Sequence, residues 1–299
     1  MLDVATHIRG AGAVLALHVN YGLREQAALD EALCRSQCAA LGVEIQVVHA
    51  GADAPRPGEQ AGNLQAWARQ LRYARAERLA GERDALIATG HTASDQVETI
   101  LYRLAASPGR RALLGMVAAE GRLIRPLLSL TREQTTCYCR ARGIEYAEDE
   151  SNADPRFART RVRHGLLPEL RTVHPAAEAN VLRTAELLRE ETELLEALVD
   201  EELAHGSFVA VARLREMPPA LARLVIVRLA EQAAGTYVPQ AGSRVAELIA
   251  LDRRGRRCEL HVGGRAGAVV EDGVVRMVRL PPRGAAHGDH DADAAPRAG

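Results

Sequence analysis

The sequence predicts an α/β fold with a mostly parallel sheet, followed by a long helix and a small α+β domain. Short apolar runs at residues 13–19, 44–50 and 84–89 alternate with segments of helical periodicity. Strands separated by helices indicate right-handed βαβ units, in which neighbouring strands are parallel. A chain of 299 residues has room for one larger and one smaller domain, so we expect two.

End signals place the helices between these strands. Residues 25–41 carry leucines at near-helical intervals and stop before Gly42, whereas residues 63–80 begin at a potential cap, Asn63, and are expected to end before the next glycine. Ligands of such sheets bind beyond the carboxyl ends of the strands, and both "HVNYGLR" and "GHTASD" follow strands. We therefore expect these two stretches to line one cleft.

The second half of the chain is predicted to change character. A helix is expected to follow "RLIRPLLSLTREQ", and a long amphipathic helix covers residues 175–205. Two short helical patterns and three alternating segments then predict a small α+β domain, in which "EDGVV" is a hairpin signal. The expected boundaries are a catalytic domain at 1–173, a helical connector at 174–206, a small substrate-binding domain at 207–280 and a disordered tail at 281–299.

Composition excludes some classes of chemistry. All 38 basic residues are arginine, which excludes lysine-based catalysis, and the net charge of −1 hides strong local clusters. Five cysteines without a secretory signal favour a reduced, cytosolic setting. Cys34 with Cys38, and Cys137 with Cys139, are either metal ligands in a non-standard spacing or small buried side chains. No apolar run reaches about 20 residues, so we expect a soluble protein with no membrane span.

Two interpretations are open for the carboxylates of "GHTASDQVET". Thr92 and Asp95 have the spacing of a capping box, which is a structural role. Glu98 follows three residues later on the same helical face, and two carboxylates beside a strand-to-helix turn are also suited to hold Mg²⁺ near a nucleotide phosphate.

Arginines and histidines supply the other candidates. Arg69 and Arg72 share a helical face and either point into solvent or reach phosphate. Arg159, Arg161 and Arg163 concentrate positive charge in a few residues, which favours contact with phosphate or RNA.

His18 and His91 follow apolar strands. Each is therefore either a cleft residue or a hydrogen-bonded structural histidine.

Several motifs in order resemble those of one family. "HVNYGLRE", "NLQAWARQLRY", "IATGHTASDQVETILYRL", "LIRPLLSLTREQ" and "EDESNADPRFARTRVRHGLLPEL" resemble tRNA(Ile)-lysidine synthetases, which are N-type PP-loop ATP pyrophosphatases with an adenine nucleotide alpha hydrolase-like domain. The resemblance covers about residues 13–170. The small C-terminal region looks like the family's tRNA-binding domain.

The resemblance implies a two-step ligation. ATP adenylates the carbonyl oxygen at C2 of the wobble cytidine in the CAU-anticodon tRNA(Ile), releasing pyrophosphate, and the amine of free L-lysine then displaces AMP. ATP and Mg²⁺ are the implied cofactors. We also expect a cytoplasmic protein that can form a homodimer. By position, Asp95, Glu98, Arg69 and Arg159 match catalytic residues of the family's motifs, with Asp95 and Glu98 as the Mg²⁺ ligands.

The remaining site assignments follow the same resemblance. His18, His91 and Arg72 are expected to contact the nucleotide, and Arg161, Arg163 and Asn152 the tRNA.

The chain also departs from the family pattern. Tyr21 and Thr160 replace a histidine and an asparagine of the motifs, which leaves Asp149, Asn152 and the arginines to organise the second of these loops. The Ser-Gly-Gly-x-Asp-Ser loop, whose backbone amides cradle ATP phosphates, is absent, and "MLDVATHIRGAG" resembles the helix that follows it. We therefore expect Met1 to be an internal or misassigned start and the chain to be a truncated, impaired synthetase.

Two other functions fit parts of the same pattern. One is a PP-loop tRNA thiolase, which commonly needs cysteine pairs. The other is a non-catalytic tRNA-binding remnant, which the missing phosphate loop favours.

Overall fold

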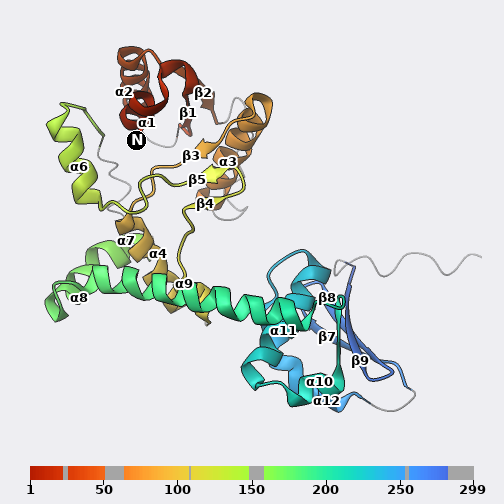
Figure 1. The fold of residues 1–299 in the computed structure, drawn as a ribbon. Helices are drawn as coiled ribbons and strands as arrows, with labels where there is room; N and C mark the ends of the chain where they lie inside the picture. The colour runs from red at the N-terminus through yellow and green to blue at the C-terminus, as the bar shows by residue number, and fades with distance from the viewer. Residues whose placement is uncertain (23–25, 51–63, 108, 148–157, 253–255, 282–299) are drawn as a thin grey trace, which may run out of the picture. The chain divides into compact units, whose positions relative to one another are not determined.

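The computed structural model describes residues 1–22, 26–50, 64–107, 109–147, 158–252 and 256–281. It divides into two compact units, Met1–Leu188 and Arg189–Gly299 (Figure 1). Unit 1 is the α/β part and unit 2 is a small α+β part, so the predicted fold class is confirmed. The domain boundaries expected at residues 173 and 206 stay predictions. No helix in the described part of the chain is long and apolar enough to cross a membrane.

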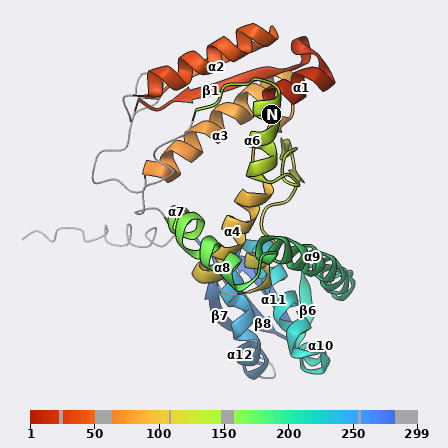
Figure 2. The ribbon, with the colours of Figure 1, turned by 90° about the vertical axis from the view of Figure 1, so that its left-hand side faces the viewer.

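Unit 1 alternates strands with helices. Its strands are β1 (Leu15–Asn20), β2 (Glu44–His49), β3 (Ile87–Ala88), β4 (Ala119–Glu120) and β5 (Leu123–Ile124). Its helical elements are α1 (Leu2–Arg9), η1 (Ala11–Ala13), α2 (Ala27–Leu41), α3 (Leu64–Arg83), α4 (Ala93–Ala106), α5 (Arg110–Leu113), α6 (Arg132–Ala141), α7 (Ala158–Arg161), η3 (Val162–Leu166) and α8 (Leu167–Val173). Figure 2 shows α2 running along β1, which it packs against.

The sheet of unit 1 is in two pieces. β1 pairs in parallel with β2, and Leu15 lies opposite Glu44. Separately, β3 pairs in parallel with β5, and β4 adds antiparallel to β5. Because β3 and β5 are parallel, the residues that follow them emerge at the same edge, where ligands of α/β sheets bind.

Glycine and a left-handed aspartate decide two helix ends. α2 stops at Gly42, whose φ of 67° closes the helix as predicted. The expectation that the next helix would end before Gly81 is wrong, because α3 continues to Arg83. Asp84 then takes a φ of 45°, and the Ala85 amide donates back to the Ala80 carbonyl at 2.9 Å. Residues 84 and 85 thus close the end of α3. The strand expected at residues 84–89 is therefore shorter than expected and consists of β3 alone.

Unit 2 is built around one antiparallel sheet in the order β6-β9-β8-β7. Its strands are β6 (Phe208–Ala210), β7 (Cys258–Gly263), β8 (Ala266–Glu271) and β9 (Val274–Arg279). Its helical elements are α10 (Val211–Glu216), α11 (Pro219–Ala234), η4 (Pro239–Arg244) and α12 (Val245–Ala250). The expected long helix is confirmed as α9 (Ala177–Glu202), which continues from unit 1 into unit 2.

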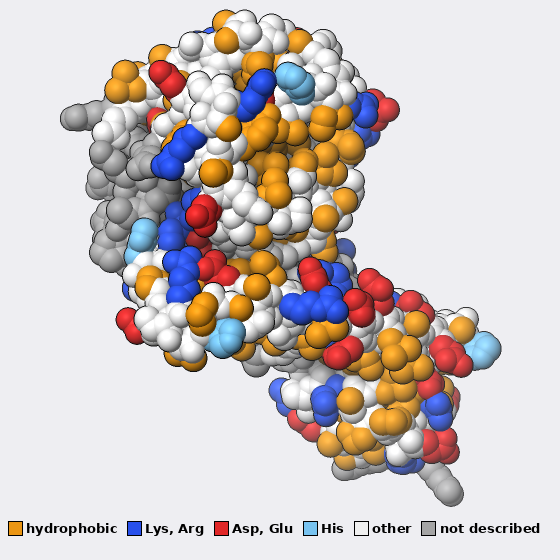
Figure 3. Space-filling model, turned by 60° about the vertical axis from the view of Figure 1, so that its left-hand side comes forward, with side chains coloured by type: hydrophobic (Ala, Val, Ile, Leu, Met, Phe, Trp, Pro, Cys, Tyr) orange, Lys and Arg blue, Asp and Glu red, His pale blue; other side chains and the backbone are white. Residues whose placement is uncertain are grey.

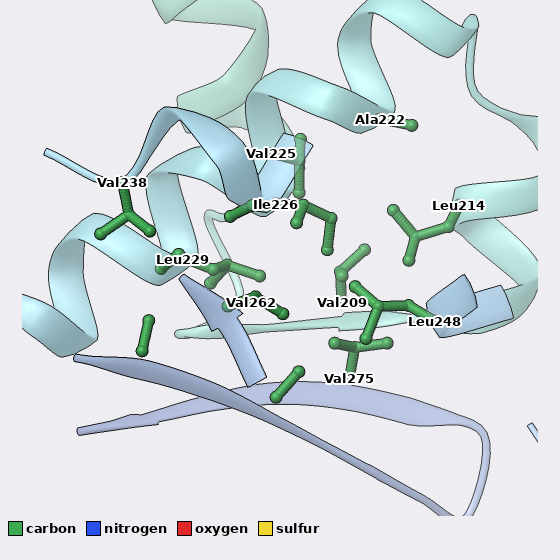
Figure 4. Packing of buried hydrophobic residues seen from close by; sticks show 14 of the residues in the cluster. Val209, Leu214, Ala222, Val225, Ile226, Leu229, Val238, Leu248, Val262 and Val275 are labelled. Atoms are coloured by element: carbon green, nitrogen blue, oxygen red, sulfur yellow. The ribbon is translucent and has the colours of Figure 1, made fainter. Parts of the chain in front are cut away.

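The larger hydrophobic core lies in unit 2. Ile226 and Leu229 of α11 pack with Leu248 of α12 and Val275 of β9, and all four are almost fully buried (Figure 4). The predicted hairpin joins β8 to β9, where Asp272 and its following glycine both have positive φ, 49° and 74°. Two successive positive φ values are the requirement of a type I′ two-residue hairpin turn, so the Asp-Gly pair explains this register.

Candidate functional site

The beginning of α4 is fixed by its own sequence. The Thr92 hydroxyl accepts a hydrogen bond from the Asp95 amide at 3.4 Å, and Asp95 Oδ2 accepts from the Thr92 amide at 2.8 Å. This reciprocal pair is the capping box that the sequence predicts. The structural interpretation of Asp95 is thus confirmed, and it leaves Oδ1 available to a second partner.

Glu98 is bound by an arginine from far along the chain. It is 2 % exposed, and Arg163 binds it side-on, with Nε to Oε1 at 2.6 Å and Nη2 to Oε2 at 2.9 Å. Arg163 lies in η3, a single π-helical turn between α7 and α8. The bidentate bond raises the pKa of Arg163, and such charge-assisted forks are strong because both N–H groups are used.

Arg132 connects the two carboxylates. Its Nη2 lies 2.9 Å from Asp95 Oδ1, and its Nη1 lies 3.5 Å from Glu98 Oε1. Its backbone amide donates to the Ser94 hydroxyl at 3.1 Å, and the carbonyl of Leu130 accepts from the Ala93 amide at 2.8 Å. The start of α6 is therefore held against the start of α4. We call Asp95, Glu98, Arg132 and Arg163 the ion-pair network.

His91 lies beside this network, at the edge of the sheet just after β3. Its Nδ1 is 2.9 Å from the Thr89 hydroxyl oxygen. Burial lowers the pKa of His91, Asp95 opposes this shift, and three cations lower the pKa further: Arg125, Arg69 and Arg159. The imidazole is therefore neutral near pH 7 and lies within electrostatic range of residues from four separate segments.

Arg69 and Arg72 stack on one aromatic ring. The guanidinium carbons lie 4.6 Å and 5.7 Å from the centroid of Tyr73. Tyr21 lies next to the same helix, since its hydroxyl donates to the Ala68 carbonyl at 2.9 Å. Both arginines are exposed on α3, and each lies within cation–π distance of this ring.

His18 is placed differently from the other candidates. Burial lowers its pKa, and the charges acting on it come from Glu31, Asp30, Arg35 and His49, so in the described residues it belongs to the surroundings of α2 and β2. The shared cleft expected for "HVNYGLR" and "GHTASD" stays a prediction.

The tRNA candidates in the arginine-rich segment divide into two groups. Arg159 and Arg161 are exposed on α7, next to the half-buried Arg163. Asn152 and Asp149 lie outside the described residues. Figure 3 shows arginine and carboxylate side chains interspersed over one face of unit 1.

The role of Asp95 and Glu98 as Mg²⁺ ligands stays a prediction. No group of three or more histidine, cysteine or acidic side chains within the described ranges has the geometry to hold a metal ion. Both oxygens of Asp95 and both of Glu98 already accept hydrogen bonds from Thr92 or from arginines. A cation at these carboxylates would share their oxygens with these donors or displace one of them.

Sequence reasoning missed two arginines of this region, Arg132 and Arg125. Arg132 directly follows the capping residue Thr131 in "LTREQ". Its place at the start of a helix could have indicated an arginine near the other helix start in the site. Arg125 stands between apolar residues in "LIRPLL", a pattern typical of a buried arginine, and it is 8 % exposed.

The fold and this site define an α/β protein that gathers arginines, a neutral histidine and two carboxylates at the carboxyl edge of a parallel sheet. A family model described as "PP-loop domain" matches residues 2–170, which is more than half of the chain. The chain belongs to the PP-loop family. The site residues described above all fall within the matched segment.

Curated relatives extend this result. The chain is 38% identical to the tRNA(Ile)-lysidine synthase of Pseudomonas putida over 198 residues, covering 63% of this chain and 44% of that protein. It is 37% identical to the tRNA(Ile)-lysidine synthase of an Azoarcus species over 232 residues, covering 74% and 50%. The enzyme of the same name from Thermus thermophilus is 38% identical over 231 residues, covering 75% and 44%. The chain spans about half the length of the curated relatives it matches.

A solved structure supports the fold. The U34-tRNA thiolase of Methanococcus maripaludis aligns with a TM-score of 0.51 at 17% identity, covering 63% of this chain and 67% of that one. At this identity the likeness concerns the fold alone.

Proposed function

We propose that this chain carries out, or is part of a protein that carries out, the reaction of a tRNA(Ile)-lysidine synthase. The observation that supports this most strongly is the similarity to tRNA(Ile)-lysidine synthases over a segment that contains the whole ion-pair network. The substrates are ATP, free L-lysine and the CAU-anticodon tRNA(Ile). A cytoplasmic location and a homodimer are parts of this proposal.

The chemistry has two balanced steps. The C2 carbonyl oxygen of the wobble cytidine attacks the α-phosphorus of ATP, forming an O–P bond while pyrophosphate leaves. The amine of lysine then attacks C2, a C–N bond forms, the C–O bond to AMP breaks, and the amine loses a proton. Negative charge develops on phosphate oxygens in the first step, so preorganised cations around those oxygens lower the barrier.

Arginines supply that positive charge. Arg69 and Arg72, beside Tyr73, together with the exposed Arg159 and Arg161, are proposed to contact phosphates of ATP or of the tRNA backbone. His91 is proposed to contact the nucleotide as a neutral hydrogen-bonding group, because its pKa is lowered.

Asp95 and Glu98 are proposed to act by positioning. They hold Arg132 and Arg163 at fixed places, so these two cations keep their orientation while charge changes nearby. Mg²⁺ is proposed to enter with the phosphates of ATP, since this ion is usually held by few protein ligands together with the substrate.

A thiolase function is the weaker alternative. Burial raises the pKa of Cys34 and of Cys38, which disfavours the thiolate that sulfur transfer needs. The described residues contain no cluster of cysteines suited to a metal or an iron-sulfur centre. The likeness to a thiolase is limited to the fold.

The test is incorporation of radiolabelled lysine into CAU-anticodon tRNA(Ile). The chain and an upstream-extended version are assayed beside the Pseudomonas putida enzyme as a positive control. Incorporation by either form of the chain supports the proposal. Release of AMP without lysine incorporation, or incorporation of sulfur instead, would point to another tRNA modification, and no reaction with either form would favour a tRNA-binding remnant.

Binding is measured separately because it does not depend on turnover. Arg159→Ala is compared with Arg183→Ala, an exposed arginine paired with Glu186 on α9. Loss of one phosphate contact reduces the salt dependence of the tRNA affinity by about one unit of log-log slope. We expect this reduction for Arg159→Ala alone, and equal slopes for both variants would remove Arg159 from the interface.

A further inference from the structure

Arg125 is a buried cation whose charge has no counterion in the described part of the chain. It is 8 % exposed and directly follows β5. Its Nη1 donates to the Val117 carbonyl at 2.6 Å. Its Nε is buried and has no hydrogen-bond partner, and no carboxylate of the described residues pairs with it.

This arrangement is unfavourable without a further partner. A guanidinium stays protonated at neutral pH, and a charge taken out of water is stable only when it is paired and hydrogen-bonded. The bond to Val117 explains why Nη1 is where it is, because it ties β5 to the residues before β4. It does not explain why Nε is buried with no hydrogen-bond partner.

The same chain shows what that edge binds. Arg163 uses its Nε and Nη2 together to hold both oxygens of Glu98, at 2.6 Å and 2.9 Å. In Arg125 the corresponding Nε and Nη2 edge has no acceptor among the described residues. Two parallel N–H groups match a pair of oxygens on a carboxylate or a phosphoryl group.

The position of Arg125 points to a ligand. β5 and β3 are parallel, so Arg125 emerges at the same sheet edge as His91, and its charge is among those that lower the pKa of His91. Arg69 and Arg159 act on the same histidine. The buried guanidinium therefore adjoins the candidate site.

We propose that the Nε and Nη2 edge of Arg125 is a binding subsite for a two-oxygen anion of the substrate. The inference rests on the proposed function for the identity of that anion, which is either the α-carboxylate of lysine or a phosphoryl group of ATP. Either anion supplies the missing counterion and fixes its carrier at the sheet edge. Arg125 is then a substrate-binding residue, separate from the ion-pair network.

The test is calorimetric titration of the full chain with four probes: L-lysine, cadaverine, ATP and inorganic phosphate. Cadaverine is L-lysine without its carboxylate. The variants are Arg125→Gln and Arg125→Lys. The matched control is Arg122→Gln, because Arg122 lies in the same hairpin and also donates to a backbone carbonyl, but it is paired with Asp84. Circular dichroism establishes that each variant is folded.

We expect both Arg125 variants to bind at least one anion tenfold or more weakly, with Arg122→Gln within twofold of the unaltered chain. A lysine side chain at position 125 keeps the positive charge but cannot form the planar fork of two N–H donors. Arg125→Lys therefore separates the contribution of the donor geometry from that of the charge. Loss for L-lysine, with no binding of cadaverine, identifies the carboxylate. Loss for ATP or phosphate identifies a phosphoryl group.

Equal affinities in all variants would overturn the inference, and so would the absence of binding of every anion to the unaltered chain. Where the variants do not fold, a crystal structure of the unaltered chain soaked with the tightest-binding anion decides: an anion within hydrogen-bond distance of Arg125 Nε supports the inference, and its absence there refutes it. Arg125-dependent binding without lysine incorporation into tRNA would refute the proposed function while leaving this subsite in place.

Discussion

Replacing Glu98 by glutamine tests whether the ion-pair network holds unit 1 together. Glutamine has nearly the shape of glutamate but no charge, so the substitution removes the partner of Arg163 without opening a cavity. The Glu98 side chain is 3 % exposed and that of Arg163 is 22 % exposed, so water compensates little for the loss. Removing one partner of a buried pair costs about 3–5 kcal/mol.

Loss of the contact with Arg132 adds little to this free-energy cost. Arg132 is 43 % exposed and lies 3.5 Å from Glu98, so water solvates it when the carboxylate is lost and its contribution is small. The bidentate bond from Arg163 dominates, and we expect Glu98→Gln to lower the free energy of unfolding by about 3 kcal/mol. For a unit of this size that corresponds to a drop in Tm of about 6–12 °C.

Trp67 provides the assay. It is the only tryptophan of the chain and lies on α3 in unit 1, 6.1 Å from the ring of Tyr21, so its fluorescence follows the unfolding of that unit. Urea unfolding is measured for Glu98→Gln, Arg163→Met and the double variant. Arg183→Gln is the control, because its pair with Glu186 is exposed and contributes less than about 1 kcal/mol.

The double variant tests whether Glu98 and Arg163 interact. If the pair exists, the second substitution costs little once the first has been made, and the coupling energy is about 2–3 kcal/mol. Additive effects, with a coupling energy near zero, would refute the pairing of Glu98 with Arg163 and with it the positioning role that we assign to Glu98.

Three further predictions concern other parts of the chain. Hydrogen bonds, of which the one from Asn20 has the largest effect, lower the pKa of Glu31 from 4.5 to about 2. The stabilisation that results is complete above about pH 4.5 and is lost as the pH falls toward 2. Glu31→Gln should therefore flatten that part of a curve of unfolding free energy against pH, measured with urea, and an unchanged curve would contradict the assignment. Gly115→Ala should cost about 1–3 kcal/mol in urea unfolding, because φ is +66° and the new Cβ would lie 2.6 Å from Gln96 Oε1; a neutral result would refute the close approach. Ile226→Ala in the core of unit 2 should cost about 2–5 kcal/mol by calorimetry, since Ile226 is 0 % exposed, and a loss below 1 kcal/mol would contradict that core.

Local patterns were the most reliable guide to this fold. The Thr92 to Asp95 spacing predicted a capping box that the structure confirms, and Gly42 ended its helix as expected. The helix end that we expected before Gly81 was wrong, and the reason is also local. Glycine is tolerated inside a helix at modest cost, and here Asp84 took the left-handed conformation that closes α3.

The candidate site was predicted in part. Asp95, Glu98 and Arg163 were identified from motif resemblance, and the structure brings them together. Their partner Arg132 was missed, and His18 was grouped with them although the charges that act on it come from α2, β2 and their surroundings. A motif assigns residues to a region, but it does not say which charged side chains pair.

The sequence by itself determined the alternation of strands and helices, the helix end at Gly42, the capping box at Thr92 and the Asp-Gly hairpin turn of unit 2, because each depends on backbone groups a few residues apart. Only the tertiary structure decided that Glu98 pairs with Arg163, that Arg132 bridges two carboxylates and that Arg125 is buried with no carboxylate partner among the residues the structure describes. These features join segments separated by tens of residues. Their energies depend on which charges packing removes from water, and no local pattern contains that information.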